Sequence, residues 1–196
     1  SFLDEDGNPT LDTDAAIGAA EMLKEVAPNA MPTMLETDFD RALQAFLGGK
    51  VGFMEFWTDL GTFSQDPEQS QIVDKWGVQQ LPTGGDAASS LAALNAGFTM
   101  TLSSSAKNPD AAKEFIQFAA SSEVNTKLIT TTGTGIDPNR LSSLNSQEYT
   151  DFNPQVQQAA TASLDGALAW PTLPESPELL QVLTDALADM IANDGD

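Results

Sequence analysis

The 196-residue sequence contains no cysteine and no histidine, and it has few basic residues. The chain therefore cannot build a Ser-His-Asp or Cys-His triad, a thiolate nucleophile, a disulfide, or a zinc site made of these ligands. Only 8 Lys and Arg stand against 29 Asp and Glu, which gives a formal net charge of −21. A nucleic-acid binder needs a basic face, and an anionic membrane surface repels such a chain. The composition argues against both kinds of partner.

The acidic charge accompanies a sequence that can still form a core. Hydrophobic residues make up 41% of the chain, with ten Phe and three Trp. We therefore expect a folded, acidic protein that carries its charge on the surface, where salt screens the self-repulsion. A halophilic source explains this composition, and an ordinary acidic secreted protein is the alternative. No stretch approaches the roughly 18 uninterrupted apolar residues of a membrane span.

The hydrophobic periodicity predicts helices that alternate with strands. Apolar residues recur at helical spacing in six segments, at 13–27, 39–47, 110–120, 122–130, 154–164 and from Pro177 to the end. Buried strands are predicted at 51–57, 76–81 and 97–102, and a short hairpin at 1–14. Thr13 or Asp14 is the expected cap of the first helix. This order predicts an α/β protein.

Two patterns resemble reactive sites only weakly. Gly133-x-Gly135 lacks the third glycine of a dinucleotide-binding loop, and no strand-to-helix unit surrounds it. Glu55 lies within an apolar strand, where a residue that faces solvent or a cleft is the simpler interpretation than a catalytic acid. No cofactor and no metal site is predicted.

The three tryptophans differ in their expected surroundings. Trp76 opens a predicted strand and is expected to belong to the core. Trp57 closes a strand, and Trp170 precedes a proline that stiffens the backbone. Position alone leaves open whether Trp57 and Trp170 pack in the core or contact a ligand.

Four segments occur in an order that is more specific than any one of them: 46–54 (FLGGKVGFM), 76–85 (WGVQQLPTGG), 105–116 (SAKNPDAAKEFI) and 133–140 (GTGIDPNR). They resemble, in the same order, elements of the extracellular solute-binding proteins of ABC importers. The closest group is the carbohydrate-binding family that includes maltose-binding protein. One departure is an alanine inserted before the lysine of the third segment.

The resemblance implies a periplasmic-binding-protein-like (type II) α/β fold. The chain would be the C-terminal half of a two-lobe hinge protein, with the N-terminal lobe missing. Residues 1–93 and 142–196 would form the second lobe, and residues 94–141 would return to the first lobe. The hinge crossings would lie near 93–95 and 141–142.

The resemblance also implies where a ligand binds. In this family the ligand lies between lobes that close like a hinge, and aromatic faces stack on sugar rings while acids and amides bond the hydroxyls. By resemblance, Trp57 and Asp59 follow the strand after which the family's stacking tryptophan commonly lies. Asn95 and Arg140 would reach the cleft, and Trp170 would lie in the late loop that supplies a second aromatic.

The function implied is that of a monomeric receptor, not an enzyme, which hands a carbohydrate to a membrane permease. It would be extracellular or periplasmic and anchored to the membrane through a missing N-terminal segment. Two alternatives stay open: a glycan-active enzyme that uses paired carboxylates such as Glu55 and Asp59, and a receptor for another solute, such as a polyol, phosphodiester or peptide. The scarcity of Lys and Arg disfavours an anionic solute.

Overall fold

A computed structural model describes residues 3–4, 6–82, 94–169 and 173–193. The chain divides into two compact units, Ser1–Asp40 with Pro171–Asp196, and Arg41–Trp170. This division into units describes the given chain alone and does not test the predicted lobe boundaries. The hinge crossings near 93–95 and 141–142 stay a prediction.

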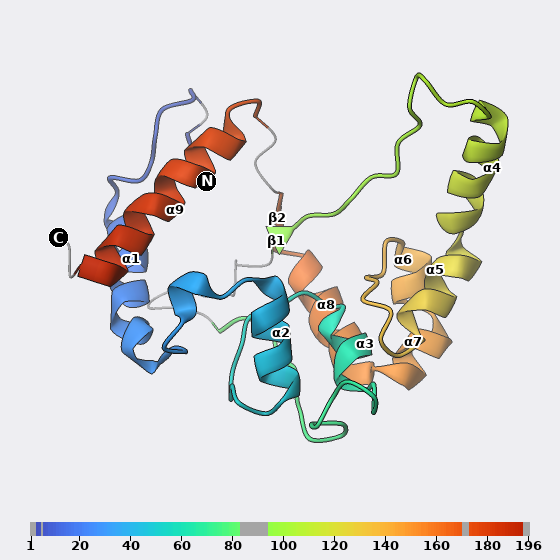
Figure 1. Cartoon of the computed structure of the whole chain (residues 1–196), viewed down its shortest axis with the longest axis horizontal. Coiled ribbons are helices and arrows are strands. Elements are labelled where there is room, and N and C mark those ends of the chain that lie inside the picture. The colour runs from blue at the N-terminus through green and yellow to red at the C-terminus, as the bar shows by residue number, and fades with distance from the viewer. Residues whose placement is uncertain (1–2, 5, 83–93, 170–172, 194–196) are drawn as a thin grey trace. The chain divides into compact units, whose positions relative to one another are not determined.

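The first unit is built on two helices, α1 (Asp14–Val26) and α9 (Ser176–Asn193), which pack against each other (Figure 1). The predicted cap of α1 is confirmed, because the side chain of Thr13 accepts a hydrogen bond from the backbone amide of Ala16 at 3.3 Å. The unit also holds two short 3₁₀ helices, η1 (Ala27–Asn29) and η2 (Met34–Glu36).

The second unit begins with a small apolar cluster. Helix α2 (Phe39–Leu47) leads into an extended segment and then into the short helix α3 (Leu60–Ser64). Leu43, Leu47 and Leu60 are buried together. Partly buried hydrophobic side chains cover this cluster, namely Phe46, Met54, Phe56 and Phe63.

The rest of the second unit is a group of short helices. They are α4 (Pro109–Ala119), α5 (Ser122–Ile129), α6 (Leu141–Leu144), α7 (Gln147–Phe152) and α8 (Pro154–Leu164). Their core consists of Ile129, Leu144, Tyr149 and Val156, and Trp76 packs against it. The prediction that Trp76 belongs to the core is thus confirmed.

The three predicted strands do not form. Within the described residues, the strands are β1 (Leu94–Asn95) and β2 (Leu168–Ala169), which pair in parallel. The segments 51–57, 76–81 and 97–102 are without regular secondary structure. A strand needs a neighbour that satisfies its backbone groups, and hydrophobic alternation cannot supply one. The predicted hairpin at 1–14 is likewise reduced to one antiparallel bridge, between Leu3 and Pro9.

The helix predicted at 110–120 forms, but its expected core face is open. Phe115 and Phe118 are 62% and 65% exposed, and Ala111 is exposed as well. Periodicity predicted that this helix has an apolar face; it could not predict what covers that face. The sequence predicts a core face of four residues here: Ala111, Phe115, Ile116 and Phe118. Ile116 is partly buried, and the prediction is wrong for the other three in the part of the chain described.

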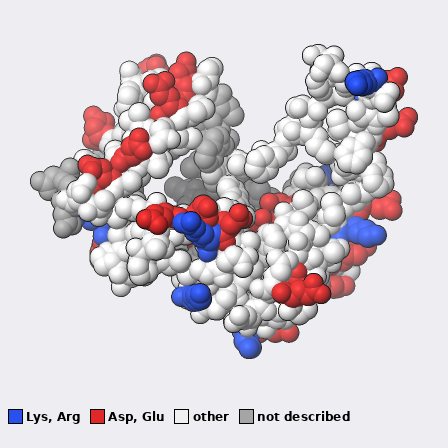
Figure 2. Space-filling model, viewed as in Figure 1, with Lys and Arg blue, Asp and Glu red and all other residues white. Residues whose placement is uncertain are grey.

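Acidic side chains are spread over the face drawn in Figure 2, with lysines and arginines scattered among them. One ion pair is Lys113 with Asp110, at 3.5 Å and exposed on α4. In the described ranges, no helix has the length and apolar character to cross a membrane.

Candidate functional site

The segment that leads to Trp57 is extended and has two unequal faces. Met54 and Phe56 point into the cluster formed with α2 and α3, while Phe53 and Trp57 are exposed on alternate positions. Trp57 is 40% exposed, and its carbonyl accepts the amide of Leu60 at 3.2 Å where the chain turns into α3. The structure therefore does not place Trp57 in the core. Its contact with a ligand stays a prediction.

Asp59, two residues further on, is buried at the start of α3. Its side chain is only 7% exposed, and Oδ1 has no hydrogen-bond partner. Burial raises the pKa of Asp59 to about 7, and the negative charge of Asp137 adds to the shift. A carboxyl group in this environment is protonated over much of the acidic range.

Asp137 comes from the loop that precedes α6, and it was not among the predicted site residues. The Thr58 hydroxyl donates a hydrogen bond to its carboxylate. Burial raises the pKa of Asp137, while the Thr58 hydroxyl opposes that shift. The backbone of this loop is fixed to α5, because Asn125 Nδ2 donates to the Asp137 carbonyl at 3.1 Å and Asn125 Oδ1 accepts the Asn139 amide at 3.2 Å.

Two glycines bring the same loop close to α3. The Gly133 amide donates to the Thr62 carbonyl at 2.9 Å, and the Gly135 amide donates to Thr62 Oγ1 at 3.1 Å. Both glycines have positive φ, 72° and 61°, which favours glycine. A Cβ would lie 2.5 Å from Asp66 Oδ2 at the first and 2.6 Å from Phe63 Cζ at the second. The Gly-x-Gly pattern therefore serves close packing here.

Tyr149 contributes a third ionisable group from α7. It is buried in the helical core, and its pKa is raised by burial and by the negative charges of Asp137 and Asp59. The three groups do not make a metal centre: within the described ranges, no set of three or more His, Cys, Asp or Glu residues could hold an ion.

The remaining predicted site residues lie in different surroundings. Asn95 is exposed in β1, where it pairs with Ala169. Arg140 turns its side chain to the end of α4, where Nε donates to the Ala120 carbonyl at 2.7 Å. Trp170 lies outside the described residues. Of the five predicted residues, Trp57 and Asp59 thus lie near each other, because they are two positions apart in the chain. The structure adds Asp137 to this group through its contact with Thr58.

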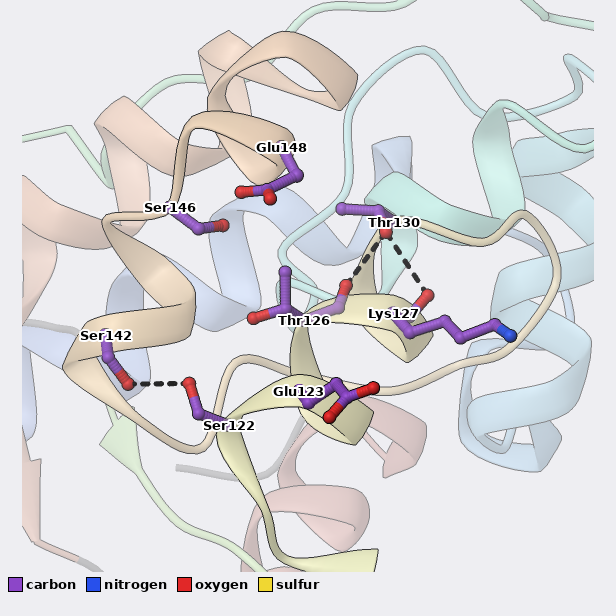
Figure 3. A pocket seen from close by; sticks show the side chains of 8 residues that line it. All are labelled: Ser122, Glu123, Thr126, Lys127, Thr130, Ser142, Ser146 and Glu148. Atoms are coloured by element: carbon purple, nitrogen blue, oxygen red, sulfur yellow. Dashed lines mark hydrogen bonds between the residues drawn. The ribbon is translucent and has the colours of Figure 1, made fainter.

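A separate groove of about 450 Å³ lies between α5, α6 and the start of α7 (Figure 3). The Ser122 and Ser142 hydroxyls are 3.0 Å apart on one side of it. Its lining is rich in hydroxyls and has no aromatic side chain: Ser122, Glu123, Thr126, Lys127, Thr130, Ser142, Ser146 and Glu148. It contains none of the predicted site residues, and it lacks a face on which a sugar ring could stack.

Comparison with known proteins matches residues 1–126 to the family described as "Bacterial extracellular solute-binding protein". A probable amino-acid ABC transporter periplasmic-binding protein of Sinorhizobium fredii is 25% identical over 193 residues, which are 97% of this chain and 42% of that relative.

Two solved structures cover the whole chain. An ABC transporter solute-binding protein from Agrobacterium radiobacter K84, in complex with ribitol, has a TM-score of 0.78 and 22% identity, and maltose-bound MalE3 of T. maritima has 0.82 and 20%. The chain covers 49% and 50% of these two structures. At such identities the likeness shows the fold alone. The chain spans about half the length of the relatives it matches.

Proposed function

The chain belongs to the family of bacterial extracellular solute-binding proteins, and from this premise we propose that it captures a solute for an ABC importer. It has the α/β fold of the periplasmic-binding-protein-like proteins, which confirms the predicted fold class. In this proposal the protein acts outside the cytoplasmic membrane as a monomer and delivers its ligand to a permease. Anchoring to the membrane stays a prediction.

The solute we propose is a carbohydrate. The observation that carries this is the half-exposed indole of Trp57, held at the end of a segment whose other face is fixed in an apolar cluster. A rigid, exposed indole gives a sugar ring a stacking face, and nearby acids and amides give its hydroxyls partners. Of the proposed ligand residues that the structure describes, Asp59 is the least accessible. Asn95, Arg140 and Trp170 complete the set by resemblance.

The proposed cleft lies between two lobes, of which this chain contributes one and part of the other. The segment proposed to return to the first lobe, 94–141, supports this with a row of open apolar side chains. Exposed there are Phe98, Met100, Phe115 and Phe118. Where exposed apolar side chains gather into a patch, they mark a surface that another part of a protein or a partner covers. Binding would shift an open–closed equilibrium without making or breaking a bond.

An amino acid is the second candidate solute, because the Sinorhizobium fredii relative is named for amino-acid transport. The buried Asp59 and the exposed Asp137 could attract its ammonium group, but the carboxylate also needs a basic partner. Arg140 is the candidate nearest in the chain, although its Nε already bonds to the Ala120 carbonyl. We therefore place a neutral sugar or polyol first.

A thermal-shift and calorimetry panel on the proposed two-lobe protein, with this chain as part of it, tests the proposal with maltose, ribitol and amino acids as ligands. We expect a sugar or polyol to raise the melting temperature, and Trp57→Ala to weaken binding without unfolding the protein. Phe53→Ala is the matched control, since it also removes an exposed aromatic ring of this segment but one that is not among the proposed ligand residues. Unchanged affinity in Trp57→Ala would refute the role of the indole, and turnover of an oligosaccharide would favour an enzyme.

A further inference from the structure

A set of hydrogen bonds joins the start of α3 to the loop before α6, although the two lie far apart in the sequence. The Thr58 hydroxyl donates to the Asp137 carboxylate across a separation of 79 residues. A second contact is the Gly135 amide on Thr62 Oγ1, and Thr62 in turn bonds the Asp59 carbonyl at 2.9 Å. These contacts fix the residues that directly follow Trp57.

The backbone of Asp137 is also held in place, by a residue of α5. Its carbonyl accepts from Asn125 Nδ2 at 3.1 Å, and Asn125 is buried in α5. Asp137 therefore links Thr58, the neighbour of Trp57, to α5. Asn125 of α5 holds the backbone of Asp137, and the Asp137 carboxylate accepts a hydrogen bond from Thr58. Since Trp57 itself is partly exposed, such a connection is a means of orienting its indole.

We propose that Asp137 is a positioning residue for Trp57: its carboxylate holds Thr58 in place, and this contact weakens when the nearby buried Asp59 also becomes negatively charged. The use of Trp57 as a ligand contact rests on the proposed function. The holding of Thr58 does not, and it can be tested without a solute.

The charges around the pair support this dependence. Asp59 lies on α3, Asp137 on the loop, and Tyr149 faces both from α7. Asp66 approaches the same loop at Gly133, with its carboxylate bonded to Gln69 at 2.7 Å. Among the described residues, no lysine or arginine forms an ion pair with Asp59 or Asp137. In the described part of the chain, a second negative charge there would therefore have no ion-pair partner.

The direction of the effect follows from the two carboxyl groups. The pKa of Asp59 is raised to about 7 by burial and by Asp137, so at about pH 6 Asp59 is mostly protonated, while the Thr58 hydroxyl stabilises a negative charge on Asp137. Above the Asp59 pKa a second negative charge forms on this buried carboxyl group, close to Asp137. Repulsion then loosens the loop from α3, and Trp57 loses its support.

Acrylamide quenching of tryptophan fluorescence tests the proposal on the chain without ligand. The signal of Trp57 is obtained as the difference between the parent and a Trp57→Phe variant, at about pH 6 and about pH 8.5, on either side of the Asp59 pKa. We expect Trp57 to be quenched more strongly at the higher pH. Asp137→Asn should abolish this pH dependence, because the pair then never carries two charges. Asp151→Asn is the control, since it removes an exposed acid that accepts from Gln147 on α7.

Thr58→Val is the second variant, and it removes the same contact from the other partner. It should leave Trp57 strongly quenched at both pH values, with unchanged far-UV circular dichroism. Equal quenching of parent Trp57 at both pH values would overturn the proposal, and this result needs no variant to fold. If no solute binds but the quenching depends on pH and on Asp137, the proposed function fails while the positioning role stands.

Discussion

The substitution Gly61→Ala tests how tightly α3 is seated. Gly61 is buried in α3, and a Cβ there would lie 2.6 Å from Asn153 Nδ2 and 3.1 Å from Val156 Cγ2. The neighbour cannot yield freely, because Asn153 Nδ2 donates to the Gly61 carbonyl at 2.9 Å and Asn153 is itself buried. The methyl group would push apart the hydrogen bond that joins α3 to α8.

Three effects set the magnitude. Replacing glycine by alanine within a helix gains up to about 1 kcal/mol. Overpacking a buried site costs about 1–3 kcal/mol, and a buried amide that loses its partner costs about 1–3 kcal/mol. We therefore expect Gly61→Ala to lower the free energy of unfolding by about 2–4 kcal/mol, in spite of the better helix propensity.

Urea unfolding followed by far-UV circular dichroism measures this change. Gly18→Ala is the matched control, because Gly18 is within α1 and a Cβ there meets nothing within 4 Å. That substitution should stabilise by about 0.5–1 kcal/mol. Asn153→Ala, combined with Gly61→Ala, should be less destabilising than the sum of the two single changes. A Gly61→Ala variant as stable as its parent would refute the close packing of α3 against α8.

Three further predictions concern stability. Ile129→Ala removes a fully buried side chain and should lower the free energy of unfolding by about 2–5 kcal/mol in chemical denaturation. Phe118→Ala, on an exposed face, should lower it much less, and equal losses would contradict the core built around Ile129. The pKa of Asp59 is 3.8 in the unfolded chain and about 7 in the folded one, so between these values the folded state holds a proton that the unfolded state has lost. The free energy of unfolding should therefore fall as the pH rises from about 4 to about 7, by about 2 kcal/mol once solvent screening of this partly solvated group is included. Asp59→Asn should flatten this decline, and an unchanged profile would exclude Asp59 as its source. With a net charge of −21, the melting temperature should rise from millimolar to molar KCl, and a constant value would contradict salt adaptation.

Local sequence signals predicted the six longer helices because their causes are local, whereas the short helices α3, α6 and α7 were not predicted. The Thr13 cap and helical spacing placed α1 correctly, and a proline at the first position marked α8. The predicted strands failed because a strand is completed by a partner that is distant in the sequence. At 53–58 the alternation of buried and exposed side chains is present, yet no neighbouring strand is described there.

The candidate site shows the same difference between local sequence signals and contacts that are distant in the sequence. Trp57 and Asp59 could be selected because a strand-like pattern precedes them and a family motif surrounds that pattern. Asp137 could not, since only the folded chain brings it to Thr58. The one available hint was Gly133-x-Gly135, because two glycines four and two residues before Asp137 indicate a close backbone approach, although the sequence does not say to what.

Two surface properties of the second unit work in opposite directions. Its aromatic side chains Phe53, Phe98, Phe115 and Phe118 are open to solvent, which favours association. The chain as a whole carries a charge of −21, so two copies repel each other at low salt. Charge of one sign therefore disfavours covering these faces with a second copy, and favours covering them with a surface of the same protein or a less acidic partner. The proposed two-lobe arrangement, in which the 94–141 segment packs on a first lobe, would agree with both properties.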